Sequence, residues 1–141
     1  MNQDQKSVVR ETWALVVPIA DIAATLFYDR LFEIDPSTRP LFKADGMAEQ
    51  RRKLTQTLDQ LVLGLDRLDE LVPMIEELGR RHLRYGVRDF HYDSVGAALL
   101  WTLERGLGSA WTPEAREAWS QVYALTAGIM QKAAREAASA A

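Results

Sequence analysis

The stretch that decides the fold of this chain is LVPMIEELGRRHLRYGV, residues 71–87. Four of its residues recur at intervals of 4, 3 and 4 positions, namely Leu71, Ile75, Leu78 and His82. This spacing places them on one face of a helix, so the imidazole of His82 lies at the end of an apolar stripe. Such an imidazole is either a core histidine bonded to a carbonyl or a ligand for a group held in the core. The spacing alone favours the core histidine.

Helical periodicity continues on both sides of this stretch. Gly and Pro are sparse and fall between periodic segments, and the alternating β-branched runs that strands need are missing. We therefore predict an all-α chain with helices over residues 3–17, 19–34, 48–65, 71–84, 90–106 and 113–137. Asp35-Pro36 opens a further short turn of helix, and residues 44–46 form a loop. Thr112 caps the last helix, with Pro113 just inside it.

Length and composition indicate one compact domain. The chain has 141 residues, of which 48% are hydrophobic and 26% charged, as in ordinary globular proteins. No repeat with a period of about 20–50 residues marks a solenoid. We expect a single domain over residues 1–141, with residues from about 134 onward as a frayed helical tail.

Charge and cysteine content exclude several classes of function. Seventeen basic and twenty acidic side chains give a net charge of −3, which is too balanced for nucleic-acid binding. A secretory signal and a bilayer-spanning apolar stretch are missing, so we expect a cytoplasmic protein without a membrane partner. The chain has no cysteine, and therefore no disulfide, iron–sulfur cluster or thiolate-bound zinc.

The second histidine, His91, lies among the first residues of a predicted helix that Asp89 would cap. Such a position is more often solvated than buried, and we expect His91 to be structural or to lie at the rim of a site. Two histidines without cysteines make a zinc enzyme improbable, because catalytic zinc usually has three side-chain ligands. Haem, which needs a single protein ligand, fits this inventory better.

A polar residue interrupts a second apolar stripe. The stripe steps by 3, 4, 4 and 3 residues through Met47, Gln50, Leu54, Leu58 and Leu61. Tyr28 similarly shares a helix face with Leu31 and Phe32. A buried amide or phenol without a hydrogen-bond partner costs about 1–3 kcal/mol, so both side chains require partners.

Two further segments extend these features over nearly the whole chain, LFYDRLFEIDPSTRPLF at 26–42 and EQRRKLTQTLDQLV at 49–62, and LGRRHLRYGV at 78–87 ends the opening stretch. Together they resemble bacterial single-domain globins and the globin part of flavohaemoglobins. The segments HYDSVG and AWSQVY further resemble the Hell's Gate type of bacterial globin. The resemblance implies a globin fold, in which the helices pack around one pocket holding haem b.

The resemblance also implies roles for individual residues. His82 matches the proximal iron ligand, and Phe42 matches the aromatic that wedges against the porphyrin. Tyr28 and Gln50 match the distal hydrogen-bond donors. The apolar residue over the iron corresponds to Leu54. The remaining matches lie under the haem or close the proximal pocket, where they are equally compatible with ordinary core, and they are Leu78, Val87, Tyr92 and Val95.

Two cations are candidates to hold the haem propionates. Lys53 lies three positions after Gln50, about 300° round the helix and so to one side of it. Arg81 directly precedes His82. Each is equally compatible with a solvated surface charge.

Three functions are compatible with these residues. The first is reversible binding of dioxygen and other diatomic gases, including carbon monoxide and nitric oxide, at a five-coordinate ferrous haem. The second is nitric oxide dioxygenation, which requires a separate reductase because the chain has no G-x-G-x-x-G segment for a nucleotide cofactor. The third is a gas sensor that acts on an unseen partner.

One departure from the family pattern favours binding over oxygen cleavage. In flavohaemoglobins a proximal tyrosine and a glutamate of the last helix polarise the iron-bound histidine. Here Tyr92 matches the tyrosine, whereas Ala134 stands at the glutamate position. Glu136 lies two residues further on and is turned roughly 200° away. We therefore expect a weak proximal push on the iron.

Overall fold

The structure is a computed structural model that describes residues 1–140. Within this range the chain forms α-helices and short 3-10 helices without any strand, which confirms the predicted all-α class. The α-helices are α1 (Gln3–Val16), α2 (Ala20–Ile34), α3 (Met47–Leu63), α4 (Leu68–Arg84), α5 (Asp89–Leu107) and α6 (Pro113–Ala140). The 3-10 helices are η1 (Val17–Ile19), η2 (Pro36–Leu41), η3 (Ala44–Gly46), η4 (Leu65–Arg67) and η5 (Gly108–Ala110). None of the helices in residues 1–140 is long and apolar enough to cross a membrane.

Most predicted helix ends lie within three residues of the observed ones. The largest shift at a helix start is at α4, which begins at Leu68 instead of residue 71 and includes Pro73. Proline removes one backbone donor, so a sequence pattern places the boundary close to it. Residues 44–46, predicted as a loop, form the single 3-10 turn η3. The last helix, α6, continues through Ala140.

Side-chain caps account for the ends of two helices. At α1 the side chain of Asn2 accepts from the backbone N–H of Gln5 at 2.8 Å, and the Gln5 side chain accepts from the N–H of Asn2 at 3.1 Å. At α6 the hydroxyl of Thr112 accepts from the N–H of Ala115 at 3.1 Å, and Pro113 is the first helical residue. The predicted cap at Thr112 is therefore confirmed.

Two glycines allow α4 and α5 to approach α6 closely. A Cβ atom added at Gly79 of α4 would lie 2.2 Å from the carbonyl oxygen of Met130 in α6. One added at Gly96 of α5 would lie 2.7 Å from the ring of Tyr123. Only a residue without a side chain fits the backbone contact at Gly79, whereas at Gly96 the Tyr123 ring would have to shift. Because Gly79 lies three residues before His82, this crossing fixes where α4 carries its histidine.

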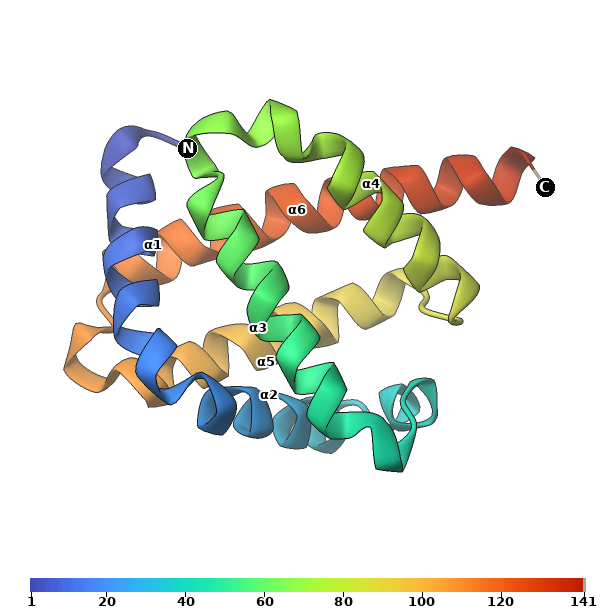
Figure 1. Ribbon diagram of the computed structural model, residues 1–141, viewed down its shortest axis with the longest axis horizontal. Coiled ribbons are helices and arrows are strands. Elements are labelled where there is room, and N and C mark those ends of the chain that lie inside the picture. Colours follow the sequence, from blue (N-terminus) through green and yellow to red (C-terminus); the bar gives the residue numbers. More distant parts are fainter. Residues whose placement is uncertain (141) are drawn as a thin grey trace.

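The buried side chains form two clusters. The large cluster joins α1, α2, α5 and α6 with the end of α3 and the start of η4, and its most deeply buried members include Val9, Leu31, Leu65, Leu103 and Trp119. The small cluster consists of Leu61, Ile75, Tyr92, Ala127 and Met130. Leu58 of α3 packs against both clusters. In Figure 1, α3 crosses in front of α5, while α2 and α4 lie on opposite sides of this crossing.

Candidate functional site

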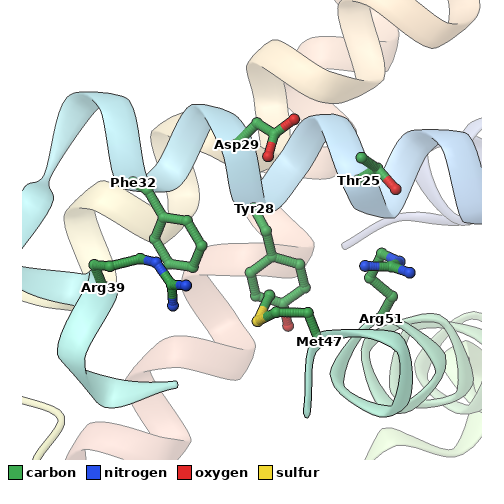
Figure 2. A pocket seen from close by; sticks show the side chains of 7 residues that line it. All are labelled: Thr25, Tyr28, Asp29, Phe32, Arg39, Met47 and Arg51. Atoms are coloured by element: carbon green, nitrogen blue, oxygen red, sulfur yellow. The ribbon is translucent and has the colours of Figure 1, made fainter. Parts of the chain in front are cut away.

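Tyr28 lies on the buried face of α2, inside a group of aromatic rings. Its side chain is 4% exposed. The Tyr28 ring meets those of Phe27 and Phe42 edge to face, with centroids 4.9 and 5.4 Å apart, and that of Phe32 lies 6.1 Å away. Figure 2 shows the Tyr28 ring projecting from α2 toward α3. Edge-to-face packing holds the ring in one orientation, so its hydroxyl has a fixed direction.

The hydroxyl of Tyr28 has one protein partner, the amide of Gln50 in α3. Gln50 Nε2 donates to Tyr28 Oη at 3.1 Å across 22 residues of sequence. Because the phenol oxygen accepts this bond, its own hydrogen is free to donate to another group. Burial raises the pKa of Tyr28 to about 12, and the bond from Gln50 opposes that rise. Tyr28 therefore stays protonated at neutral pH and remains a hydrogen-bond donor.

His82 occupies the last turn of α4 and is half-buried. Its Nδ1 lies 2.7 Å from the carbonyl oxygen of Leu78. A carbonyl only accepts hydrogen bonds, so Nδ1 carries the hydrogen and Nε2 keeps a lone pair. Burial lowers the pKa of His82, the bond to Leu78 opposes this, and the nearby charge of Arg81 lowers the pKa further. A neutral imidazole with its Nδ1–H bonded to a carbonyl is the form in which histidine binds metals through Nε2.

Leu78, Val87 and Tyr92, which were predicted on the same side of the haem as His82, all belong to or pack against the small cluster. Leu78, one turn earlier on α4, and Val87 in the α4–α5 loop are half-buried against the small cluster. The backbone N–H of Val87 donates to the carbonyl of His82 at 2.9 Å. Tyr92 of α5 is 8% exposed, and its hydroxyl has no hydrogen-bond partner among residues 1–140. Burial, with the charge of Asp89, raises the pKa of Tyr92 to about 12.

Three apolar residues of the predicted site pack against the large cluster, which includes Tyr28. Phe42 ends η2, Leu54 lies on α3 and Val95 on α5, and each packs half-buried against the large cluster. Val95 lies one turn after Tyr92 on α5 and packs against the large cluster, whereas Tyr92 belongs to the small one. These side chains, like Leu78 and Val87 beside the small cluster, keep part of their apolar surface exposed, and that surface could be covered by an apolar ligand.

The two predicted cations lie at the surface. Arg81 is exposed, and its Nε lies 3.6 Å from Glu77 Oε1. Glu77 also pairs with Arg80 and Arg84 at 3.0 and 3.3 Å. Lys53 is exposed on α3. Exposed ion pairs are weak, so Arg81 is able to exchange Glu77 for another anion.

His91 is buried, with a side chain that is 4% exposed, so it takes the structural role that was one of its two predicted alternatives, although such positions are more often solvated. Its Nδ1 accepts from the backbone N–H of Arg88 at 2.9 Å, and Nε2 lies 3.1 Å from the hydroxyl of Ser37. Nδ1 is an acceptor here, so Nε2 carries the hydrogen and donates it to Ser37. Arg88, and not Asp89, is the capping position of α5. Both nitrogens of His91 are thus used within the protein.

Asp35 extends this hydrogen-bonded group, which sequence reasoning missed. One carboxylate oxygen of Asp35 accepts from Ser37 at 2.5 Å and the other from Ser94 at 2.6 Å. These bonds, with a smaller contribution from the charge of His91, lower the pKa of Asp35. The group ties η2, which leads to Phe42, to the first turns of α5. The one local sequence signal for this group is the position of His91 in the first turn of α5, where its side chain can accept from the N–H of the capping residue.

Comparisons with known proteins agree with this architecture. The family model described as Globin matches residues 25–130. A flavohemoprotein of Bacillus subtilis is 26% identical over 85% of this chain, and the chain spans only 31% of its length. Neuroglobin of Chaenocephalus aceratus is 27% identical over 94% of this chain and 91% of its own.

Two solved structures have the same fold. A bacterial globin from Campylobacter jejuni superimposes with a TM-score of 0.86 at 18% identity, covering 98% of this chain and 99% of the other. A heme protein of a tardigrade, described as hexacoordinated, gives a TM-score of 0.86 at 19% identity and 96% coverage of both chains. The predicted globin fold is therefore confirmed, and with the family match over residues 25–130 the chain belongs to the globin family.

Proposed function

We propose that this chain binds one haem b through His82 and reversibly holds dioxygen, with Tyr28 as the main hydrogen-bond donor to the gas. Membership of the globin family indicates haem-based gas binding. The roles given to individual residues are the part that we propose. The observation that carries it is the buried bond between Gln50 and Tyr28, which leaves the phenol hydrogen free to donate. The resemblance to the Hell's Gate type and the cytoplasmic location stay predictions from the sequence.

The residues present fit haem on both sides. A neutral imidazole with a lone pair at Nε2 suits ferrous or ferric iron. The apolar side chains left half-buried suit the faces of a porphyrin, and they are Phe42, Leu54, Leu78, Val87 and Val95. We call Tyr28, Phe42, Gln50 and Leu54 the distal wall, and Leu78, His82, Val87 and Tyr92 the proximal wall. Arg81 and Lys53 are the proposed partners of the propionates.

Haem, when bound, supplies an iron that takes up diatomic gases. On the proximal wall, the carbonyl of Leu78 holds the imidazole of His82 in one tautomer and orientation. On the distal wall, Gln50 holds the phenol oxygen of Tyr28, and the free phenol hydrogen would donate to a gas held by the haem iron. One bond of this kind contributes about 1–2 kcal/mol, so it raises affinity by roughly 5–30-fold. Dioxygen gains more than carbon monoxide, whose outer atom carries less charge.

Replacing Tyr28 by Phe tests this assignment. The aromatic packing of Tyr28 is retained, and we expect dioxygen to leave the reduced protein about 5–30-fold faster because one donor is lost. Carbon monoxide release should change by less. Tyr85→Phe is a matched control, since Tyr85 is 66% exposed. Stopped-flow release of dioxygen at the wild-type rate from Tyr28→Phe would contradict the proposal.

The use of both His91 nitrogens supports a five-coordinate ferrous iron. His91 would have to give up two hydrogen bonds to become a second ligand. The tardigrade protein described as hexacoordinated has the same fold, so the coordination number depends on side chains. The absorption spectrum of the reduced, gas-free protein should therefore be that of high-spin, five-coordinate haem. A six-coordinate, low-spin spectrum would overturn this part of the proposal.

Nitric oxide dioxygenation with a separate reductase is the second candidate. The match to a flavohemoprotein favours it. Against strong oxygen activation, the hydroxyl of Tyr92 has no partner within residues 1–140, and Ala134 stands where a polarising glutamate is expected. Repeated nitric oxide consumption with a supplied reductase would place this activity first. The role as a gas sensor stays a prediction without a specific observation in its favour.

A further inference from the structure

Two hydrogen-bonded bridges join the first turns of α5 to the start of η2. In the first, His91 Nε2 donates to the hydroxyl of Ser37 at 3.1 Å. In the second, the hydroxyl of Ser94 donates to Asp35 Oδ2 at 2.6 Å. Ser37 also donates to Asp35 Oδ1 at 2.5 Å, so the two bridges form one closed group. His91 and Ser94 are three residues apart and therefore lie on the same face of α5.

This group holds the segment that leads to Phe42. η2 ends at Leu41, and Phe42 follows it directly. Thr38 within η2 is 1% exposed, and its hydroxyl donates to the carbonyl of Asp35 at 2.7 Å. A 3-10 helix has poor hydrogen-bond geometry and is uncommon beyond three or four residues. Because η2 has six residues, its position depends on contacts such as the two bridges.

Phe42 in turn limits where the ring of Tyr28 can lie. The two rings meet edge to face, with centroids 5.4 Å apart. A half-open depression of about 210 Å³ lies beside Tyr28, between α2, η2 and the start of α3. Figure 2 shows the Met47 side chain lying across the Tyr28 ring there, and a methionine side chain adapts easily. A displaced Phe42 would therefore leave the Tyr28 ring room to turn.

We propose that His91 and Ser37 are positioning residues for gas binding, which act on Tyr28 through η2 and Phe42. This inference rests on the proposed role of Tyr28 as donor to the gas. A hydrogen bond weakens steeply when its angle at the hydrogen falls below about 120°. A small displacement of Phe42 therefore weakens the bond from Tyr28 to the gas, while the ligand of the iron stays the same.

Replacing Ser37 by Ala in the haem-loaded full chain tests the proposal. This change removes the hydroxyl that joins His91 to Asp35 and leaves Tyr28 in the chain. We expect dioxygen to leave the reduced protein about 2–5-fold faster than from the wild type, because the donor is displaced and not removed. Ser37→Thr keeps a hydroxyl at this position and should restore the wild-type rate in stopped-flow measurements.

A capping bond elsewhere in the chain provides the matched control. His91→Ala removes the bond to Ser37 together with the bond that His91 Nδ1 accepts from the N–H of Arg88. Gln5→Ala removes the equivalent capping bond of α1, which Gln5 accepts from the N–H of Asn2. Both variants lose a cap, but only His91→Ala should release dioxygen about 2–5-fold faster.

Hydrogen exchange shows whether η2 has moved. The N–H of Thr38 donates to the carbonyl of Asp35 at 3.0 Å, and that of Phe42 donates to the carbonyl of Arg39 at 3.2 Å. Both amides should exchange about 10-fold faster in Ser37→Ala, while the amides in the middle of α6 should exchange at wild-type rates.

The carbon monoxide complex supplies a spectroscopic readout of the donor itself. The C–O stretching band responds to a hydrogen-bond donor near the outer atom of the gas. In Ser37→Ala this band should shift part of the way toward its position in Tyr28→Phe, whereas Gln5→Ala should leave it unchanged. A purely structural role of Ser37 would not move the band.

Two results would overturn the proposal. One is release of dioxygen from Ser37→Ala at the wild-type rate while Tyr28→Phe releases it faster, because Tyr28 then acts without help from the bridges. The other is faster release from Gln5→Ala to the same extent as from His91→Ala, which would trace the effect to a general loss of stability. Release at the wild-type rate from Tyr28→Phe itself is a separate outcome, in which the proposed function fails and this inference with it.

Discussion

The distal and proximal walls each carry a buried tyrosine, but the two phenols differ in their partners. Tyr28 on the distal wall accepts a hydrogen bond from Gln50, whereas the hydroxyl of Tyr92 on the proximal wall has none among residues 1–140. The distal wall rests on the large cluster and the proximal wall on the small one. This difference fits the proposed roles, in which the distal wall donates to the gas and the proximal wall holds the imidazole of His82.

The two histidines show the same contrast. His82 uses only Nδ1, at 2.7 Å from the carbonyl of Leu78, while His91 uses both ring nitrogens. Burial therefore does not identify a metal ligand, since His91 is the more buried of the two. The lone pair left available at Nε2 distinguishes them.

The largest expected effect follows from removing His82. His82→Ala should weaken haem binding more than about 100-fold, exceeding the 10–100-fold loss typical of an outer partner of a metal ligand. His91→Ala should keep haem affinity within about threefold but lower the free energy of unfolding by about 2 kcal/mol. Haem titration of the apoprotein and denaturant unfolding measure the two quantities. The opposite pattern would transfer the role of iron ligand to His91.

A smaller effect tests how the proximal wall is positioned. Gly79→Ala places a methyl group against the backbone of Met130 and should lower the free energy of unfolding by about 2–3 kcal/mol. Gly128→Ala is the control, since a Cβ at Gly128 in α6 meets nothing within 4 Å. This variant should gain about 0.5–1 kcal/mol, because alanine favours the helix. Equal stabilities in denaturant titrations would show that the α4–α6 crossing tolerates expansion.

Alkaline unfolding depends on the phenols of both walls. The pKa values of Tyr28 and Tyr92 are raised to about 12 in the folded protein, against 10.0 when unperturbed. Below pH 10 the phenols are neutral in both states, and stability is unaffected by them. Between pH 10 and about 12 the unfolded chain loses these protons first, so the free energy of unfolding should fall. Tyr28→Phe should flatten this fall, and a profile unchanged from wild type would argue against a buried, neutral Tyr28.

The smallest effect concerns the hydroxyl of Tyr92. Tyr92→Phe removes a buried polar group that lacks a partner, so the apoprotein should be unchanged or stabilised by up to about 1 kcal/mol. Tyr123→Phe is the control, because it removes a phenol hydroxyl from the same α5–α6 contact that does have a partner. The Tyr123 hydroxyl donates to the carbonyl of Tyr92 at 2.5 Å. That variant should lose about 1 kcal/mol. A larger loss in Tyr92→Phe would show that its hydroxyl has a partner in solution.

Much of the fold was predictable because helix signals are local. Apolar spacing gave the six helices, and Thr112 with Pro113 gave the start of α6. The inward direction of His82 followed from its stripe. The placement of Tyr28 beside Gln50 was suggested by the family resemblance, since 22 residues separate them and no local pattern pairs them.

Other features were not predictable from single segments. The choice between a structural and a rim position for His91 was left open because its partner Ser37 lies 54 residues away. Asp35 was recognised as the start of a turn, but its bond to Ser94 spans 59 residues. Arg39 and Arg51 have the sequence signature of ordinary surface charges. Only the packing of η2 and α3 against α2 places them around the half-open depression beside Tyr28.

The sequence by itself determined where the helices lie and which residues face inward, because both depend on a repeat of about 3.6 residues within one segment. Tertiary structure alone decided which histidine nitrogen keeps its lone pair, which tyrosine gains a partner and how closely α4 approaches α6. These properties depend on the distances between atoms of different helices. Such distances are set by how side chains pack at helix crossings, which no single periodic pattern specifies.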